Sequence, residues 1–333
     1  MKRLLLTGGG GFVGAHTFAH IMHNTDWEVV VIDSFRHKGK TDRLTEMLDS
    51  HPDWKERLQV EVHDLRAPFS EQLIYRIGKI DYIINMASES HVDRSIEEPV
   101  EFIKNNVDLV LNVLEYARVI KPEKFIQIST DEVYGPMYDK PHPEWSSILP
   151  SNPYSASKAS QEAIAIAYWR TYGVPVIITN TMNIIGEMQD PEKFLPMLIQ
   201  KINKGEKVTI HGKKGDIGSR FYLHARNQAD ALLFILNNAP VGLFPDYQDP
   251  IRLNVVGEVQ INNLNLAKMV AEIMGKKLKY QLVGFHSTRP GHDPHYGLDG
   301  WKLEHLGWTA PLPFYDSLKN TVEWTLDHPE WLL

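Results

Sequence analysis

The chain has 333 residues, 43% of them hydrophobic and 23% charged, a composition typical of a soluble globular protein with one large or two closely joined domains. Its formal net charge of −7 excludes a general attraction for nucleic acid or anionic membranes, so an anionic ligand must be bound by a few local Arg or Lys side chains. Cysteine is absent, which excludes disulfides, thiol catalysis and thiolate metal sites and agrees with a cytoplasmic location. No apolar run approaches the roughly 18 residues of a membrane helix, so we expect neither a membrane nor a nucleic-acid partner.

Short apolar and β-branched runs alternate with longer helical patterns through the first half of the chain. Continuous apolar runs are typical of parallel strands, because helices cover both faces of such a sheet. The expected strands are residues 4–6, 28–32, 58–62, 82–85, 125–129 and 176–179. The predicted fold class is therefore α/β, with a Rossmann-type doubly wound parallel sheet.

After residue 181 the sequence changes to longer loops rich in Pro, Gly and Asn, with helical patterns at 193–203, 227–237 and 264–274. A further apolar run at 251–256 is predicted to return as a strand to the first sheet. We therefore expect a dinucleotide-binding domain over 1–180 that includes this returning strand. Residues 181–333 are expected to form mainly a smaller, interleaved C-terminal α/β domain that binds the substrate.

A glycine-rich turn follows the first expected strand. The turn fits both common dinucleotide-binding spacings, with Gly8, Gly11 and Gly14 in one and Gly9, Gly11 and Gly14 in the other. Positions without side chains let backbone amides and a helix N-terminus approach a pyrophosphate. The turn therefore predicts a bound dinucleotide, with the intervening Phe12 and Val13 beside it.

Asp33 ends the second expected strand, where a carboxylate accepts hydrogen bonds from an adenosine ribose and repels a 2′-phosphate. A helix or turn cap is the alternative interpretation of this residue. Arg36 and Lys38 lie close by in the sequence and are able to tolerate a phosphate, so NAD is predicted and NADP stays open. Asp64 and Leu65, after the third strand, are expected to meet the adenine or to form an ordinary turn.

Tyr154 and Lys158 are four residues apart, hence on one face of a helix. A lysine ammonium group and an oxidised nicotinamide near a phenol lower the pKa of the phenol, which makes a base for a hydroxyl proton. The same spacing occurs at Tyr75/Lys79 and Tyr315/Lys319, so spacing alone has little weight.

Tyr154 is singled out by its position after a buried strand that ends in Ser129-Thr130-Asp131-Glu132. Parallel α/β sheets bind ligands at the carboxyl ends of their strands. Thr130 is then able to share a substrate hydroxyl with Tyr154. Adjacent carboxylates in unlike environments can separate into an acid and a base, which Asp131 and Glu132 are predicted to do.

Other polar residues are weaker candidates. Arg220 and Arg289 are either surface charges or bidentate ligands of a diphosphate. The 15 histidines include no HExxH pattern, and the spacing around His292 does not indicate zinc, so no metal is expected.

The sequence resembles the extended short-chain dehydrogenases/reductases, and among them the nucleotide-sugar 4,6-dehydratases, along nearly its whole length. The Thr-Asp-Glu triplet at 130–132 carries most weight, because epimerases and decarboxylases of this superfamily generally lack that pair of acids. The other matching segments are residues 7–14, 86–96, 129–135, 154–158, 191–193, 289–293 and 321–324.

The resemblance implies an internal redox cycle with tightly bound NAD on a nucleotide-activated hexose similar to dTDP-glucose. Tyr154, assisted by Lys158 and Thr130, would deprotonate the C4 hydroxyl as hydride leaves C4. Glu132 would then remove the C5 proton while Asp131 protonates the C6 oxygen that leaves as water. Return of hydride to C6 gives a 4-keto-6-deoxy sugar.

Further site residues follow from the resemblance alone. It places Ala87, Ser88 and Ser129 at the cofactor, and Ser90 and His91 beside the sugar. At the nucleotide diphosphate it places Asn183, Arg220, Asn254, Arg289 and His292.

The resemblance also implies a homodimer in which helices near 100–120 and 155–171 pair with their copies in a four-helix bundle. The chain departs from the family pattern at 182–187, 220–222 and 109–110. Some of these changes border the expected pockets, so the nucleobase and the hexose stay open.

Two other functions stay open. One keeps the fold but performs C4 epimerisation or decarboxylation of a nucleotide sugar. The other is a non-enzymatic protein that senses NAD(H), for which the four residues Asp131, Glu132, Tyr154 and Lys158 would have no use.

Overall fold

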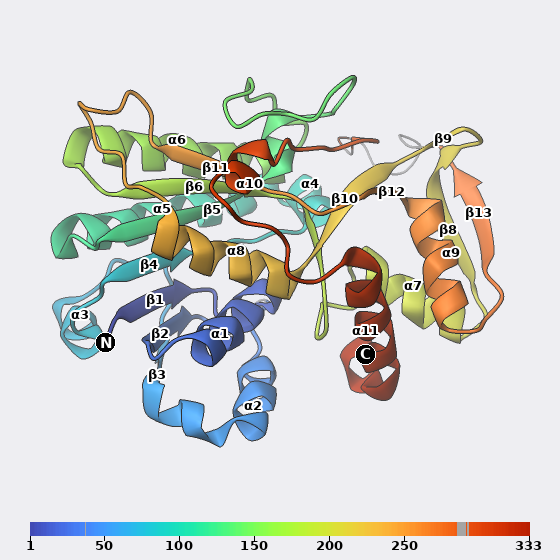
Figure 1. Cartoon of the computed structure of the whole chain (residues 1–333), viewed down its shortest axis with the longest axis horizontal. Helices are drawn as coiled ribbons and strands as arrows, with labels where there is room; N and C mark the ends of the chain where they lie inside the picture. Colours follow the sequence, from blue (N-terminus) through green and yellow to red (C-terminus); the bar gives the residue numbers. More distant parts are fainter. Residues whose placement is uncertain (37, 285–290, 292) are drawn as a thin grey trace.

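The computed structural model describes residues 1–36, 38–284, 291 and 293–333. A sheet of seven parallel strands forms its centre, in the spatial order β11-β6-β5-β4-β1-β2-β3 (Figure 1). The strands are β1 (Arg3–Thr7), β2 (Glu28–Asp33), β3 (Leu58–Val62), β4 (Tyr82–Asn85), β5 (Lys124–Thr130), β6 (Val176–Thr181) and β11 (Ile251–Val255). The chain order reverses beside β1, which leaves the crevice between β1 and β4 where doubly wound sheets bind ligands.

Helices cover both faces of this sheet because successive strand residues point to opposite sides. Leu4 and Leu6 pack with one group of helices, whereas Leu5 packs with the other. The first group is α1 (Phe12–Asn24), α2 (Thr41–Ser50), α8 (Ala225–Asn238) and α10 (Trp301–His305). The second group is α3 (Glu71–Ile77), α5 (Pro99–Ile120) and α6 (Pro153–Tyr172). The predicted α/β fold class is confirmed.

A smaller α/β part with its own apolar core lies at the right of Figure 1. One of its sheets has the order β12-β10-β7 and the other β13-β8-β9. Its strands are β7 (Asn183–Ile185), β8 (Lys207–Lys213), β9 (Asp216–Ile217), β10 (Ser219–His224), β12 (Gln260–Asn262) and β13 (Lys279–Val283). Its helices are α7 (Phe194–Asn203), α9 (Asn263–Ile273) and α11 (Phe314–Asp327).

The two parts are interleaved in the chain. After β7, β8, β9, β10 and α8 the backbone comes back as β11, which pairs in parallel with β6 from Ile251 opposite Ile177. The chain then leaves again for β12 and α9. The remaining elements are α4 (Val92–Glu97) and the 3₁₀ helices η1 (Pro52–Arg57), η2 (Asp131–Tyr134) and η4 (Pro329–Leu332).

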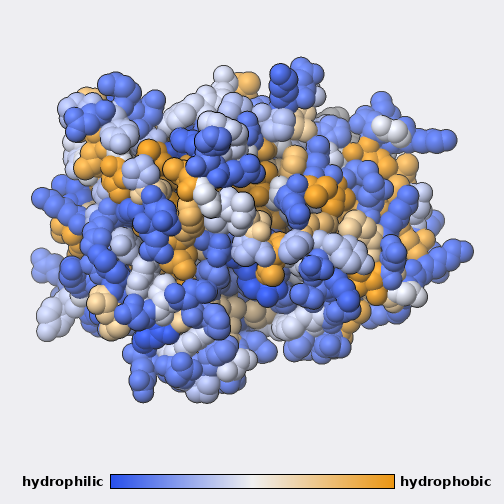
Figure 2. Space-filling view, in the orientation of Figure 1, coloured by the Kyte–Doolittle hydropathy of each residue, from blue (hydrophilic) through white to orange (hydrophobic). Residues whose placement is uncertain are grey.

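On the face seen in Figure 2 hydrophilic residues cover most of the surface, with apolar residues visible between them. No helix in the described part of the chain is long and apolar enough to cross a membrane.

Candidate active site

The turn between β1 and α1 needs glycine at two positions. Gly8 has φ +72°, and a Cβ there would lie 2.9 Å from the Cα of Ala87. A Cβ on Gly14 would lie 2.1 Å from the carbonyl oxygen of Gly8, so α1 packs directly on the turn. Gly11 caps α1 without a side-chain hydrogen bond, and the first turn, which begins at Phe12 and Val13, contains no acidic residue. The positive end of the helix dipole therefore suits an anionic group at this turn.

Asp33 contacts the same turn. One carboxylate oxygen accepts a hydrogen bond from the Gly10 amide at 3.0 Å, and the other accepts from the Phe35 amide at 2.9 Å. The carboxylate thus joins the glycine turn after β1 to the loop after β2, beside the crevice.

Asp64 forms ion pairs with Arg36 at 2.7 Å and with Arg66 at 2.9 Å. Partial burial favours the neutral acid, but the hydrogen bonds from Arg66 and the charge of Arg36 outweigh it and lower the pKa of Asp64. The neighbouring Leu65 side chain is buried in the core. Arg36 is therefore held by a carboxylate next to the expected adenosine position.

The end of β5 carries a buried hydroxyl and a buried acid. Thr130 Oγ1 donates a hydrogen bond to Asp131 Oδ1 at 2.9 Å. Burial and the charge of Glu132 raise the pKa of Asp131 to about 7, against the opposing effects of Thr130 and Arg220. Asp131 is thus able to carry a proton near neutral pH.

Glu132 has different partners from Asp131. It accepts hydrogen bonds from Asn152 Nδ2 at 3.2 Å and from the Tyr296 hydroxyl at 3.4 Å. Burial raises the pKa of Glu132, and the charge of Asp293 adds to this, while Asn152 and Arg220 oppose it. Two adjacent carboxyl groups therefore sit in unlike surroundings.

Helix α6 brings Tyr154 to these acids. Asn152 forms a capping box with Ser155, so the first turn of α6 starts directly behind η2. The Tyr154 phenol lies within electrostatic reach of Glu132 and Asp131, and the Thr130 hydroxyl favours its ionised form. Burial and the two carboxylates raise the pKa of Tyr154. The lowering of this pKa expected from the sequence requires positive charge, whereas the charges that act on the phenol here are the carboxylates of Glu132 and Asp131.

Lys158 lies one turn further along α6 and is 4% exposed. Its ammonium donates to the Ile128 carbonyl at 2.7 Å and to Gln161 Oε1 at 2.6 Å. Burial lowers the pKa of Lys158 to about 8.

The two other Tyr–Lys pairs with the same spacing lie outside this site. The Tyr75 side chain is 88% exposed and Tyr315 is 50% exposed. Lys79 pairs with Asp81, and Lys319 pairs with Glu323. Only the pair on α6 joins the residues at the end of β5.

The loop after β4 packs against the glycine turn. The amide of Ala87 donates to Thr7 Oγ1 at 3.1 Å, and Ser88 donates to the Glu89 carbonyl. His91 caps α4 and lies 3.8 Å from Glu192, while the Ser90 carbonyl accepts from Lys193 at 3.2 Å.

Two predicted substrate residues hold loops in this structure. Arg220 donates to the carbonyls of Pro294 and Asp293 and lies 4.4 Å above the Tyr296 ring. Asn254 is fully buried, and its amide donates to the carbonyls of His142 and Asp299.

The three remaining residues predicted to bind the substrate are Asn183, Arg289 and His292. Asn183 is exposed at the start of β7, where it pairs with Tyr222. Arg289 and His292 lie outside the described residues.

Sequence reasoning missed Asn152 and Tyr296, which both contact Glu132. An Asn directly before Pro153 is a typical helix N-cap, so the cap signal could have placed Asn152 beside Tyr154. Tyr296 carries no such local signal, because only folding brings it to η2.

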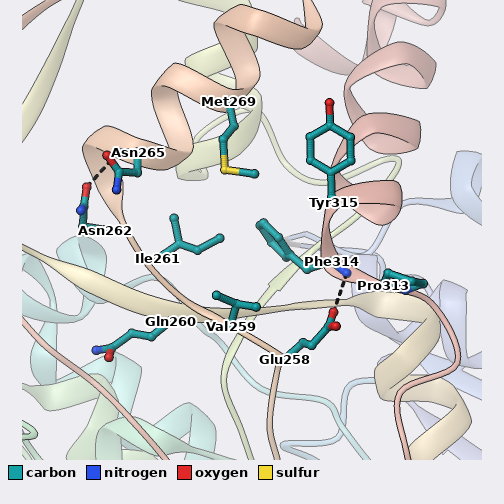
Figure 3. Close-up of a pocket in the computed structure, with 10 residues that line it drawn as sticks. All are labelled: Glu258, Val259, Gln260, Ile261, Asn262, Asn265, Met269, Pro313, Phe314 and Tyr315. Atoms are coloured by element: carbon teal, nitrogen blue, oxygen red, sulfur yellow. Dashed lines mark hydrogen bonds between the residues drawn. The ribbon is translucent and has the colours of Figure 1, made fainter.

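A hollow of about 530 Å³ lies away from these residues, between β12, α9 and the start of α11 (Figure 3). Its lining is largely apolar, and Glu258 accepts a hydrogen bond from the Phe314 amide at its edge. In the described part of the chain, no group of three or more His, Asp or Glu side chains is arranged to hold a metal ion.

A family model described as GDP-mannose 4,6 dehydratase matches residues 5–321. The chain belongs to this family. The resemblance to nucleotide-sugar 4,6-dehydratases of the extended short-chain dehydrogenase/reductase superfamily is confirmed.

Curated relatives agree with this assignment. The chain is 33% identical over 358 residues to dTDP-glucose 4,6-dehydratase of Escherichia coli, covering 99% of this chain and 94% of the relative. It is 32% identical over 327 residues to the low-salt glycan biosynthesis protein Agl12 of Haloferax volcanii. The match covers 98% of this chain and 99% of that relative.

Solved structures give the same result. The dTDP-glucose 4,6-dehydratase DesIV from Streptomyces venezuelae, solved with NAD bound, has a TM-score of 0.86 and 30% identity. The match covers 99% of this chain and 98% of that chain. UDP-glucuronic acid 4-epimerase from Bacillus cereus has a TM-score of 0.86 at 22% identity, which indicates the shared fold alone.

Proposed function

We propose that this protein is an NAD-dependent nucleotide-hexose 4,6-dehydratase that converts a nucleotide-activated hexose to its 4-keto-6-deoxy derivative with loss of water. The observation that carries the proposal is the gathering of Thr130, Asp131, Glu132 and Tyr154 at the carboxyl end of β5. The named activity of the Escherichia coli and Streptomyces venezuelae relatives supports the same reaction.

The residues around the glycine turn fit NAD. The turn leaves no room for a Cβ at Gly14, Asp33 borders it, and the buried Ser129 hydroxyl has no hydrogen-bond partner among the described residues. The NAD bound in the Streptomyces venezuelae relative supports this choice of cofactor. When bound, NAD supplies a hydride acceptor and donor.

Each residue then has one task. Tyr154 takes the proton of the C4 hydroxyl, which Thr130 also contacts, and Lys158 supplies the positive charge that favours the phenolate. Glu132 removes the C5 proton, and Asp131 protonates the C6 oxygen as it leaves. The different surroundings of the two carboxyl groups support this division into base and acid.

Incubation with dTDP-, UDP-, GDP- and CDP-hexoses, followed by mass spectrometry of the products, tests the reaction. A product lighter by one water is expected from one nucleotide sugar. Tyr154→Phe is expected to lower the rate at least 10²-fold, roughly the contribution of a general base. The matched controls Tyr75→Phe and Tyr315→Phe keep the wild-type rate.

An isomer of unchanged mass would replace the proposal with C4 epimerisation. A protein that carries NAD and leaves every nucleotide sugar unchanged would indicate the sensor. A full rate in Glu132→Gln would overturn the assignment of the C5 base.

We also propose that the protein works as a cytoplasmic homodimer. Outward residues of α6 support the dimer, because the charged side chains Lys158 and Glu162 of this helix are buried while Ala163 and Ala167 are exposed. Small, uncharged side chains at these two outward positions suit close packing against a second copy in a four-helix bundle.

A further inference from the structure

Gln161 contacts the ammonium group of Lys158 from the same helix. Lys158 Nζ donates to Gln161 Oε1 at 2.6 Å, and the second acceptor of this ammonium among the described residues is the Ile128 carbonyl. Both side chains are at least nine-tenths buried. A charge-assisted hydrogen bond in such surroundings is stronger than one in water.

A chain of buried hydrogen bonds reaches Gln161 from the glycine turn. The Thr7 hydroxyl donates to Asn85 Oδ1 at 2.8 Å, and Asn85 Nδ2 donates to Gln127 Oε1 at 2.8 Å. Gln127 Nε2 is 3.3 Å from Gln161 Oε1, to which it donates. Every donor in this chain points toward Gln161, so the chain polarises the oxygen that Lys158 contacts.

The other end of the Gln161 amide is fixed as well. Gln161 Nε2 donates to the Asn106 carbonyl at 2.8 Å, and the Asn106 side chain bonds Ser157 and the backbone of Glu89. The amide therefore has one orientation, with its oxygen toward Lys158.

We propose that Gln161 is the positioning residue of Lys158, and that its oxygen, oriented by the hydrogen-bond chain from Thr7, holds the ammonium at the end of β5. This inference rests on the proposed function, in which Lys158 supplies positive charge at the cofactor. It connects the turn that binds the cofactor phosphates with the lysine at the other end of the cofactor.

The surroundings of Lys158 make its pKa sensitive to the hydrogen bond with Gln161. The charged group that acts on Lys158 is Glu162 on α6, which pairs with Arg252 on β11. The other titratable groups at this end of β5 are Tyr154, Asp131 and Glu132. Burial already lowers the pKa of Lys158, so loss of an acceptor lowers it further, whereas a carboxylate at position 161 raises it.

The test measures NAD affinity by calorimetry between pH 6 and pH 10 on the full-length protein freed of bound nucleotide. Gln161→Met keeps the side-chain length and removes the acceptor, and Gln161→Glu keeps the acceptor and adds charge. Gln228→Met is the matched control, because Gln228 is also a buried glutamine, on α8, and accepts from Thr181.

In the wild type, affinity is expected to fall above the Lys158 pKa of about 8. In Gln161→Met the fall begins about one pH unit lower, so affinity well above pH 8 drops roughly tenfold relative to the wild type, the size expected for one charge-assisted hydrogen bond. In Gln161→Glu the fall begins about one pH unit higher.

Matching pH profiles in Gln161→Met and Gln228→Met would overturn the inference, and so would an unchanged profile in Gln161→Glu. Thermal melting of all variants separates a loss of stability from a change in profile. Because no sugar is present, the result stands even if the protein turns over no nucleotide hexose, which is the failure that the product assay detects.

Discussion

Asp131 and Glu132 are adjacent in the short helix η2, but their side chains have different neighbours. Asp131 faces the Thr130 hydroxyl, and its second oxygen has no partner among the described residues. Glu132 instead accepts from Asn152 and Tyr296. The tendency of each carboxyl group to hold or release a proton is therefore set by its neighbours and not by the residue type.

The protonation of Asp131 predicts a pH dependence of the water-elimination step. Its pKa is raised to about 7, so the protonated form needed to donate to the leaving oxygen dominates below this pH. Elimination is expected to slow by roughly tenfold per pH unit well above pH 7. Rapid mixing with substrate, with the absorbance of reduced cofactor as readout, separates elimination from C4 oxidation.

Asp131→Asn provides the matched variant for this experiment. It removes the titrating proton, so C4 oxidation continues while elimination loses its acid and slows about 10²–10⁴-fold. An elimination rate in Asp131→Asn that equals the wild type at pH 6 would contradict the role of this residue.

The sequence predicted that Thr130 and Asp131 lie together at the end of a buried strand, because a strand fixes the direction of its last side chains. It did not predict hydrogen-bond partners that come from distant loops. Arg220 and Asn254 donate to carbonyls of residues 293, 294, 142 and 299, and only folding brings those carbonyls near. The presence of an Arg or Asn in a motif therefore predicts that its side chain donates hydrogen bonds, but it does not predict which group accepts them.

At the scale of elements, the buried parallel strands were predicted to within two residues, since burial on both faces requires a continuous apolar run. All six strands of the smaller part were missed: β7, β8, β9, β10, β12 and β13. None is buried on both faces along its length: β8 alternates between buried and less buried residues, most of β13 is exposed, and β9 has only two residues.

The contact between the glycine turn and α1 predicts the effect of Gly14→Ala. The added Cβ would lie 2.1 Å from the Gly8 carbonyl, so α1 must move away from the turn. We expect loss of copurified NAD, measured by absorbance and mass spectrometry.

Gly78→Ala is the control for this variant. Gly78 has φ +71° with no atom within 4 Å of the added Cβ, so it costs backbone strain of about 1–3 kcal/mol and keeps the cofactor. Equal NAD content in the two variants would contradict the proposed contact.

A buried ion pair ties α6 to β11. Arg252 and Glu162 lie 2.9 Å apart, and both are almost fully buried. Glu162 also accepts from Asn180, whose amide donates to the Thr130 carbonyl. Through Asn180 the pair is connected to the end of β5 that carries Thr130.

Arg252→Met is expected to lower the free energy of unfolding by about 3–5 kcal/mol, because it leaves a buried charge without its partner. Glu162→Gln in the same chain should restore much of this loss. Urea unfolding measures both, and Lys319→Met, which breaks an exposed pair, should cost no more than about 1 kcal/mol. Additive losses in the double variant would contradict coupling of the two residues.

At the scale of the whole molecule, α6 leaves a stretch of small apolar side chains exposed, one turn before the exposed Arg170. Ala163 and Ala167 on α6 are exposed, and Ile166 between them is partly exposed. In water such a face is better covered by another apolar surface, as the proposed bundle would do.

Ala163→Glu is expected to convert the dimer to a monomer, because a carboxylate would be buried between the two copies of α6. Light scattering coupled to size-exclusion chromatography measures the mass. Asn320→Glu, exposed on α11, is the control and should leave the dimer intact. A monomeric wild type, or a dimer that withstands the Ala163 change, would rule out this interface.

The return of β11 to the edge of the large sheet has a consequence for protein engineering. Residues 182–250 form an excursion that is closed at both ends by strands of one sheet, and the chain after residue 255 forms a second excursion. Grafting a different sugar specificity onto this scaffold therefore requires two coordinated exchanges with strand 251–255 left in place. A single exchange of everything after residue 181 that brings no matching strand would leave the backbone of β6 unpaired and exposed to other chains.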